Sequence, residues 1–434
     1  MNKSNTTWAQ RDTAVNWHPF TSIKTAGEAV AIVRGEGTYL YDEKGKRYID
    51  AISSWWVNLH GHAHPYIAEQ VYEQLRTLEH VIFAGFTHPP AIALSEALLA
   101  VLPENQQKVF YSDNGSTAVE VALKMALQYA YNRGEKKPLV LAFRLGYHGD
   151  TFGAMAVSSR SGWTAPFAEL LFDVTRIDLP TAENLPEIQA FIDQHADHIA
   201  CFVYEPLVLG AGGMLMYEAA QLDALMRYCR SRHILLVQDE IFVGFGRTGR
   251  MFAADHLTEK PDIMCLSKGL TGGTMPLGVT TCTAAIYEAF CTDNVYGTLF
   301  HGHSFTANPL ACRAALASLE LLQKEETQAA IARICKQHEA FRARIAAHNS
   351  LQVVRQCVVR QCVVRQCGTI LAMNIGDGGK DAYFRNQCKP VFEALLQKGI
   401  LLRPLGNVLY LVPPYCISDD DLQYIYNSII EVLS

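Results

Sequence analysis

The chain has 434 residues, of which 49% are hydrophobic, and its formal net charge at pH 7 is −6. This length predicts a large buried core with more than one domain, and the negative charge argues against nucleic acid or an anionic membrane as the main partner. The chain has no apolar signal core at its start and no stretch near the roughly 18 apolar residues of a membrane span, so we expect a cytoplasmic protein whose twelve cysteines are reduced thiols.

The chain divides into three sections with different residue patterns. Residues 76–325 alternate short apolar runs with amphipathic stretches, whereas residues 1–75 and 326–434 do not follow this alternation. We therefore predict a large domain over 76–325. We also predict a smaller α+β domain that is built from both ends of the chain.

The middle section is typical of an α/β fold. Alternating strands and helices predict a mostly parallel central sheet with helices on both faces, and ligands in such sheets bind beyond the carboxyl ends of the strands. The predicted strands are 108–112, 139–143, 200–205, 234–239, 262–267 and 277–282, and the predicted helices include 116–131, 218–231 and 309–324.

A phosphate-binding loop is predicted between the first of these strands and the first helix. Gly115 allows the backbone to approach a ligand closely, and Ser116 and Thr117 offer hydroxyls that can cap the helix. The free N–H groups of the first helical turn attract an anion. Glu120 and Lys124 lie one turn apart and are expected to pair, which supports the helix.

An acid and a lysine close two apolar runs that follow one another along the chain. Asp239 ends the run 234–239, and Lys268 directly follows the run 262–267. Pyridoxal 5'-phosphate chemistry needs these two groups, because a lysine bonds to the cofactor aldehyde and a carboxylate keeps the pyridine nitrogen protonated. Either residue alone would usually be a solvated charge, so the prediction rests on the pair. Glu205 ends another run and is expected near the same cofactor.

A second group of polar residues precedes the predicted helix 309–324. Gly302, His303 and Ser304 lie in a segment that leads into this helix as 111–116 leads into the first one. Ser304 is therefore a second candidate ligand of the phosphate.

Residues 353–367 repeat Val-Val-Arg-Gln-Cys three times without a mismatch. A period of five fits neither a strand nor a helix well, so we expect a ten-residue insertion that forms an extended loop near a strand. The spacing of Cys357, Cys362 and Cys367 and the lack of partner histidines argue against a metal site. No metal is predicted elsewhere.

These motifs together resemble the class III aminotransferases, a family of fold-type-I enzymes that use pyridoxal 5'-phosphate. The resemblance implies that Lys268 bonds to the cofactor and moves a proton between the substrate carbon and the cofactor C4′, while Asp239 pairs with the pyridinium nitrogen. It rests on the segments 238–249, 267–273 and 301–309, and it covers nearly the whole chain from about residue 15, apart from the repeat.

Four further segments resemble the branch of this family that converts 8-amino-7-oxononanoate to 7,8-diaminononanoate in biotin biosynthesis. Most members of this branch use S-adenosylmethionine as the amino donor. They are homodimers with active sites at the subunit interface, so the resemblance implies that Ser304 reaches the phosphate bound in the partner subunit. The four segments are 17–22, 53–56, 146–151 and 403–415.

The resemblance also assigns residues to a cofactor site and a substrate pocket. Trp55 and Trp56 would form an apolar wall for the alkyl chain, Arg403 would bind the substrate carboxylate, and Tyr147 would lie against the cofactor ring. Lys268, Asp239 and Tyr147 are the expected catalytic residues. The expected cofactor-binding residues are Gly115, Ser116, Tyr147, Glu205, Asp239, Lys268, His303 and Ser304, and the expected substrate-binding residues are Phe20, Trp55, Trp56, Tyr147, Lys268, Gly302, Arg403 and Tyr410.

Two positions depart from the family pattern. Phe20 stands where a tyrosine is often found, which removes a hydroxyl from the expected donor pocket, and His303 stands where several relatives have proline. Some relatives take their amino group from lysine, so lysine stays open as an alternative donor.

Three other functions compete with this reading. One is a class III ω-aminotransferase that acts on a diamine or an ω-amino acid. Another is a catalytically inactive binding protein on the same fold, which the retention of Lys268, Asp239 and both phosphate loops opposes. The third is a nicotinamide oxidoreductase that uses the glycines at 244–249, but an acidic pair precedes these glycines and no helix is expected after them.

Overall fold

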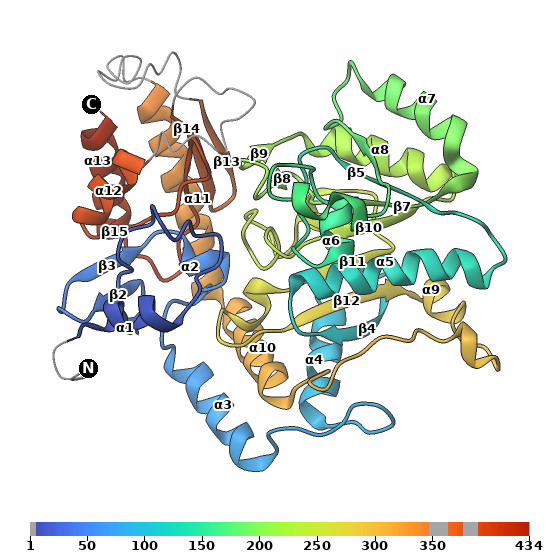
Figure 1. Cartoon of the computed structure of the whole chain (residues 1–434), viewed down its shortest axis with the longest axis horizontal. Helices are drawn as coiled ribbons and strands as arrows, with labels where there is room; N and C mark the ends of the chain where they lie inside the picture. The colour runs from blue at the N-terminus through green and yellow to red at the C-terminus, as the bar shows by residue number, and fades with distance from the viewer. Residues whose placement is uncertain (1–5, 347–362, 376–388, 434) are drawn as a thin grey trace.

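The computed structural model describes residues 6–346, 363–375 and 389–433, and Figure 1 shows their arrangement. The largest sheet of this part of the chain has seven strands in the order β4-β12-β11-β10-β7-β5-β6. Strand β12 is antiparallel to both of its neighbours, and the other neighbouring pairs are parallel. The strands are β4 (Gln106–Ser112), β5 (Leu139–Phe143), β6 (Thr175–Ile177), β7 (Ile199–Tyr204), β10 (Leu235–Asp239), β11 (Ile263–Leu266) and β12 (Gly278–Thr283).

This sheet confirms the predicted α/β fold with a mostly parallel sheet. Each predicted strand is present, and its bounds differ from the prediction by no more than two residues. The sequence prediction lacked β6, which has three residues and is too short to show a periodic pattern.

Helices cover both faces of the sheet because successive strand residues point to opposite sides. Leu236 belongs to one hydrophobic cluster and Val237 to the other. Helix α5 packs on the face of Val237, and α8 packs on the face of Leu236. The helices around the sheet are α3 (Pro65–Thr77), α4 (Pro89–Leu99), α5 (Gly115–Asn132), α6 (Phe152–Val157), α7 (Leu185–His195), α8 (Ala219–Ser231), α9 (Ala284–Glu288) and α10 (Pro309–Leu322).

The two ends of the chain meet in a second sheet, at the left of Figure 1. Its order is β1-β2-β3-β15, and β3 pairs in parallel with β15. A third sheet has the order β13-β14-β16, and a short fourth one pairs β8 with β9. These strands are β1 (Ile32–Glu36), β2 (Tyr39–Asp42), β3 (Arg47–Asp50), β8 (Val208–Leu209), β9 (Leu215–Met216), β13 (Val364–Cys367), β14 (Ile370–Asn374), β15 (Ile400–Leu401) and β16 (Val408–Leu411).

The helices beside these smaller sheets come from both ends of the chain. They are α1 (Trp8–Val15), α2 (Ser53–Trp56), α11 (Glu325–Ala346), α12 (Lys389–Gln397) and α13 (Asp419–Leu433). Nowhere in the described ranges is there a helix with the length and apolar character needed to cross a membrane.

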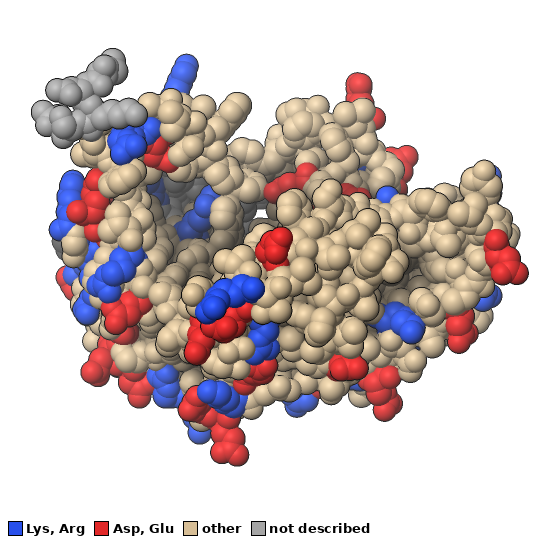
Figure 2. All heavy atoms as spheres, turned by 90° about the horizontal axis from the view of Figure 1, so that it is seen from below, with Lys and Arg blue, Asp and Glu red and all other residues tan. Residues whose placement is uncertain are grey.

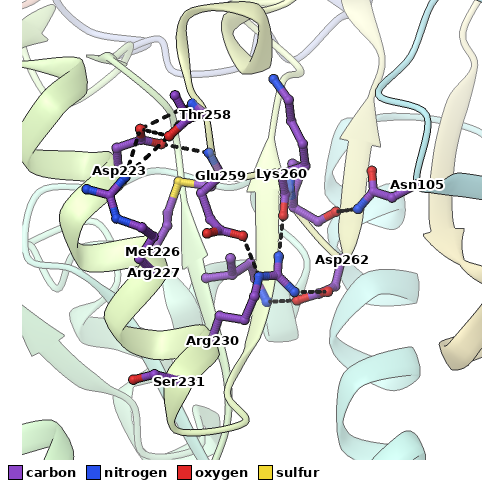
Figure 3. A network of polar contacts seen from close by, with 12 residues as sticks. Asn105, Asp223, Met226, Arg227, Arg230, Ser231, Thr258, Glu259, Lys260 and Asp262 are labelled. Atoms are coloured by element: carbon purple, nitrogen blue, oxygen red, sulfur yellow. Dashed lines mark hydrogen bonds and ion pairs between the residues drawn. The ribbon is translucent and has the colours of Figure 1, made fainter.

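A polar network fixes the register between β10 and β11 (Figure 3). Arg230 Nη1 donates to Asp262 Oδ1 at 3.0 Å, and the other oxygen of Asp262 accepts the N–H of Leu236 at 2.8 Å. Asp239 then lies opposite Cys265 in the parallel pairing. The acid at the end of β10 and Lys268, just beyond β11, therefore leave the sheet at the same edge.

The last copy of the five-residue repeat forms a strand, so the ten-residue insertion that is expected as an extended loop corresponds to the other two copies. Residues 364–367 form β13, where Arg365 lies opposite Ala372 of β14. Arg365 also donates to the carbonyls of Met214 and Gly213 at 3.1 and 3.0 Å. Valine favours strands, and pairing with a neighbouring strand outweighs the poor period. Residues 353–362 of the repeat lie outside the described residues.

Deleting residues 353–362 should leave the fold intact. The same protein results from deleting 358–367, because the copies are identical, and the one remaining copy supplies β13. A twofold change in the length of a connection costs only about 0.6 kcal/mol. We expect a soluble variant whose thermal midpoint lies within a few degrees of that of the wild type. Insoluble protein would show that the extra copies are needed for folding.

Candidate active site

Lys268 opens the short 3₁₀ helix η4 (Lys268–Thr271) directly after β11. Its backbone φ angle is +45°. Residues other than glycine rarely adopt such a value, and those that do often lie at functional sites. Its Nζ lies 4.8 Å from the ring centroid of Trp56 and 5.8 Å from that of Phe242. Burial lowers the pKa of Lys268, against the charges of Asp239 and Glu205. The shift is toward the neutral amine, which is the nucleophilic form of a lysine.

Asp239 is buried at the end of β10 and is held by two hydrogen bonds. His148 Nδ1 donates to its Oδ2 at 2.7 Å, and the N–H of Ile241 donates to its Oδ1 at 3.0 Å. Burial lowers the pKa of His148, but the hydrogen bond and charge of Asp239 and the charge of Glu205 outweigh it, and the net pKa is raised. His148 therefore holds the Asp239 carboxylate in place through a charge-assisted hydrogen bond.

Glu205 follows β7 and lies buried beside this pair. Its Oε1 accepts the N–H of Tyr147 at 3.0 Å, and its Oε2 accepts the N–H of Gly210 at 2.9 Å. Burial raises the pKa of Glu205 to about 7, with His148 opposing the shift. Glu205 thus fixes the backbone at Tyr147, whose hydroxyl donates to Asp150 Oδ2 at 2.9 Å.

The first turn of α5 lies next to the acid. A Cβ at Gly115 would lie 2.9 Å from the side chain of Ile241, the residue whose N–H binds Asp239. Only glycine fits this close approach. Asn114, and not Ser116 or Thr117, is the N-cap, because its Oδ1 accepts the N–H of Thr117 at 3.1 Å. Ser116 Oγ instead accepts the N–H of Asp150 at 3.1 Å, which ties α5 to the segment after Tyr147.

The expected pair of Glu120 with Lys124 is not formed. Glu120 Oε1 accepts the N–H groups of Gly153 and Ala154 at 2.7 and 3.1 Å, and Lys124 Nζ lies 3.1 Å from His301 Nδ1. The free N–H groups at the start of α6 attract the carboxylate more strongly than an exposed ammonium does.

Phe20, Trp55 and Arg403 come together from distant parts of the chain. The rings of Phe20 and Trp55 meet edge to face with centroids 5.5 Å apart, and Arg403 Cζ lies 4.1 Å from the centroid of Trp55. Among the described residues no carboxylate forms an ion pair with Arg403. Its guanidinium therefore retains donors for an anion.

Trp56 links this group to the lysine. It is buried, its Nε1 donates to the hydroxyl of Tyr410 at 3.1 Å, and its ring lies 4.4 Å from Phe242. Trp55 and Trp56 are adjacent, so the ring on which Arg403 stacks and the ring beside Lys268 belong to one short turn. We call Trp55, Trp56, Phe242 and Tyr410 the aromatic wall.

The segment with Gly302, His303 and Ser304 runs beside α5 of the same chain. His301 contacts Lys124, and the carbonyl of Thr298 accepts from Gln128 Nε2 at 2.9 Å. Ser304 itself is exposed. Its contact with a phosphate in a partner subunit stays a prediction.

Sequence reasoning missed His148 and Phe242 as members of the site. His148 follows Tyr147 in the segment 146–151, and Phe242 lies three residues after Asp239. A histidine beside a predicted site tyrosine was a usable signal. Its bond to Asp239 spans 91 residues, so the partner was not readable from local pattern.

The residues brought together here fit pyridoxal 5'-phosphate. A buried acid can face the pyridine nitrogen, and a buried amine with a lowered pKa can reach the aldehyde. The free N–H groups of α5 begin at Gly115, which contacts Ile241 beside the acid. His148 Nε2 is buried without a hydrogen-bond partner in the described part of the chain. It could therefore form a hydrogen bond with a group bound at the site.

Comparison with known proteins agrees with this chemistry. The family model "Aminotransferase class-III" matches residues 22–433. A relative from Synechococcus elongatus named adenosylmethionine-8-amino-7-oxononanoate aminotransferase is 46% identical, over 96% of this chain and 98% of its own length. The crystal structure of the protein of that name from Methanocaldococcus jannaschii has a TM-score of 0.90 at 36% identity, covering 97% of each chain. A transaminase from the marine bacterium Virgibacillus has a TM-score of 0.88 at 28% identity, covering 98% of each.

Replacing Glu205 with Gln should change how stability depends on pH. The pKa of Glu205 lies above its ordinary value of 4.5, so the folded state binds this proton more tightly than the unfolded state. The stability that the protonated carboxyl contributes is present below about pH 5 and is lost as pH rises through about 7. Between pH 5 and pH 8, the free energy of unfolding of the variant should rise by on the order of 2 kcal/mol relative to that of the wild type.

Thermal midpoints of both proteins at the two pH values test this. Glu36→Gln serves as the control, because Glu36 is exposed and should give no such trend. A difference between Glu205→Gln and wild type that does not vary with pH would contradict the raised pKa.

Proposed function

The chain belongs to the class III aminotransferase family, and we propose on that premise that it transfers an amino group to 8-amino-7-oxononanoate to make 7,8-diaminononanoate in biotin biosynthesis. The observation that carries the proposal is the position of the Lys268 amine, 4.8 Å from the Trp56 ring, beyond the sheet edge where Asp239 ends β10. The names of the relatives from S. elongatus and M. jannaschii support the substrate.

Pyridoxal 5'-phosphate, when bound, supplies an electron sink that stabilises negative charge at the reacting carbon of the substrate. Asp239 would hold the proton on the pyridine nitrogen, and His148 would hold Asp239 in place. Lys268 Nζ would bond to the aldehyde and then take and return the proton at the reacting carbon. The N–H groups at Gly115 and Ser116 would bind the phosphate, with Gly302, His303 and Ser304 lying near it or near the substrate.

The substrate would lie along the aromatic wall. Its alkyl chain suits the rings of Trp55 and Trp56, which bring apolar area at low cost in conformational entropy. Arg403 would bind the terminal carboxylate, because a guanidinium forks onto two oxygens at once. Tyr147 would cover the cofactor ring from the segment that Glu205 fixes.

We further propose S-adenosylmethionine as the amino donor. The names of the relatives from S. elongatus and M. jannaschii support this choice. Phe20 packs on Trp55 at the open side of the wall and is 52% exposed, so it is placed to contact a donor. An aromatic ring attracts a cation such as a sulfonium, and Phe20 retains that ring without the hydroxyl.

A homodimer with a shared active site completes the proposal. Ile82, Phe86, Phe300 and Phe305 are each more than half exposed, and large apolar exposure of this kind marks an interface. Figure 2 shows a face with broad uncharged areas and a hollow in which Lys or Arg atoms are visible. A partner on such a surface would bring Ser304 of one subunit near the phosphate of the other.

We also place the protein in the cytoplasm. In the described residues all nine cysteines are free thiols, as expected in a reducing compartment.

Product analysis tests the proposed reaction. The purified protein is loaded with pyridoxal 5'-phosphate and given 8-amino-7-oxononanoate with S-adenosylmethionine, or with lysine in its place. We expect 7,8-diaminononanoate with the first donor. Product with lysine alone would change the donor and keep the reaction. Turnover of a diamine or an ω-amino acid without any turnover of 8-amino-7-oxononanoate would reject the proposed substrate.

Lys268→Ala should lower turnover on the order of a thousandfold or more, because it removes the amine that would bond to the aldehyde and move the proton. The visible absorbance of the bound cofactor should also shift, since the covalent bond to Nζ is lost. Lys324→Ala, at an exposed lysine, is the control and should match the wild type. Near-normal turnover in Lys268→Ala would remove it from the chemistry.

Arg403→Ala should raise KM for 8-amino-7-oxononanoate by about 10- to 100-fold, the loss expected for a charge-assisted pair. Cofactor affinity should change little, because Arg403 stacks on Trp55, which is assigned to the substrate pocket. Arg34→Ala removes an exposed guanidinium and should leave KM alone. An unchanged KM in Arg403→Ala would exclude it from the pocket.

A further inference from the structure

The turn that carries Trp55 and Trp56 has an unusual backbone. Ser53, Ser54 and Trp56 have positive φ angles of 51°, 59° and 68°, and ψ of Ser54 is −83°. Residues other than glycine rarely have positive φ angles, and the φ and ψ angles of Ser54 approach those of a strained γ-turn. Such strain persists only where the surrounding contacts determine it, and it gathers at functional sites.

Asp50, the last residue of β3, supplies those contacts. Its side chain has no exposed area, and its carboxylate accepts the N–H groups of Ile52 and Ser54 at 3.2 and 2.7 Å. The hydroxyl of Ser54 donates at 3.2 Å, and His62 Nε2 at 2.8 Å. A buried carboxylate needs such donors to offset its desolvation. The acid and the turn therefore stabilise one another.

Asp50 also lies opposite the strand that leads to Arg403. It is paired with Leu401 of β15, and the N–H of the next residue, Ala51, donates to Leu401 O at 3.1 Å. Arg403 follows two residues later and stacks on Trp55. Both the turn and the arginine are thus placed relative to the end of β3.

A second bond connects the turn to the far side of the aromatic wall. Ser53 Oγ donates to the carbonyl of Val412 at 2.8 Å, and Val412 follows β16, which carries Tyr410. The N–H of Val412 donates to the carbonyl of Ala51 at 2.9 Å. A shift of the turn would therefore displace Trp56 from both Tyr410 and Lys268.

We propose that Asp50 is a positioning residue that sets the shape of the substrate pocket by holding residues 52–56 in their strained conformation. This inference rests on the proposed function, because the pocket is assigned to 8-amino-7-oxononanoate. Asp50 acts through Trp55 and Trp56. Its loss should therefore weaken substrate binding while the cofactor site, built on β10, β11 and α5, remains.

Asp50→Asn tests this with little change in size. The amide turns one acceptor oxygen into a donor, which then faces an N–H of the turn or of His62. We expect KM for 8-amino-7-oxononanoate to rise by about tenfold, the effect of one hydrogen bond to a charged group. The dissociation constant of pyridoxal 5'-phosphate, measured by titration of its absorbance, should stay as in the wild type.

Asp223→Asn is the matched control. Asp223 is also a buried carboxylate that accepts two N–H groups, those of Thr258 and Glu259 at 3.0 and 2.9 Å (Figure 3), but it lies on α8. The Asp223→Asn variant should lower the thermal midpoint about as much as Asp50→Asn does, and its KM for 8-amino-7-oxononanoate should equal that of the wild type. Equal KM values in the two variants would overturn the proposal and leave Asp50 a structural residue only.

Two further variants decide the case if Asp50→Asn does not fold. His62→Leu removes one donor from Asp50, and His62→Gln restores one. A raised KM in the first that returns toward the wild-type value in the second supports the proposal, and equal KM values overturn it. A wild type that does not turn over 8-amino-7-oxononanoate would reject the proposed function and the inference with it.

Discussion

The parallel pairing of β10 with β11 is the constraint on which the site depends. Asp239 lies opposite Cys265 in this pairing, so the acid and Lys268 leave the sheet at one edge although 29 positions separate them in the sequence. At the other end of β11, Asp262 binds both Arg230 and the N–H of Leu236 and so prevents a change of register. A slip of one residue would turn Asp239 to the opposite face of the sheet, away from His148 and from the first turn of α5. The proposed chemistry thus depends on the register of β10 and β11, which the backbone hydrogen bonds between the strands set.

The substrate side depends on a different pairing, that of β3 with β15. This pairing joins residues near the start of the chain to residues near its end and brings Trp55 under Arg403. Trp56 connects the parts that the two pairings position, because its ring contacts Lys268 and its indole N–H donates to the hydroxyl of Tyr410. A pocket formed between two such units can change its substrate through the smaller sheet while the cofactor site stays constant. This separation allows members of one family to share a cofactor site and act on different substrates.

Much of this arrangement was predictable from the sequence because it follows from local pattern. Apolar runs that end in Asp239 and just before Lys268 predicted both the strands and the edge to which the two residues belong. Contacts across long separations were not predictable. The bond from His148 to Asp239 spans 91 residues, and the N-cap of α5 had to be chosen among several adjacent polar residues. Glu120 binds α6 and not Lys124, because tertiary contacts outweigh a weak pair within one helix. The last copy of the repeat is a strand for the same reason.

The first half of the reaction, followed without acceptor, is the most direct test of Lys268 and Asp239 as a transamination site. The protein loaded with pyridoxal 5'-phosphate is mixed with S-adenosylmethionine, and the absorbance of the bound cofactor is followed as its aldehyde becomes an amine. We expect loss of the aldehyde form in the wild type and no conversion to the amine in Lys268→Ala. Conversion by lysine alone would require a different donor pocket around Phe20. Absence of conversion by any amine would contradict the assignment of Lys268 and Asp239 as a transamination site.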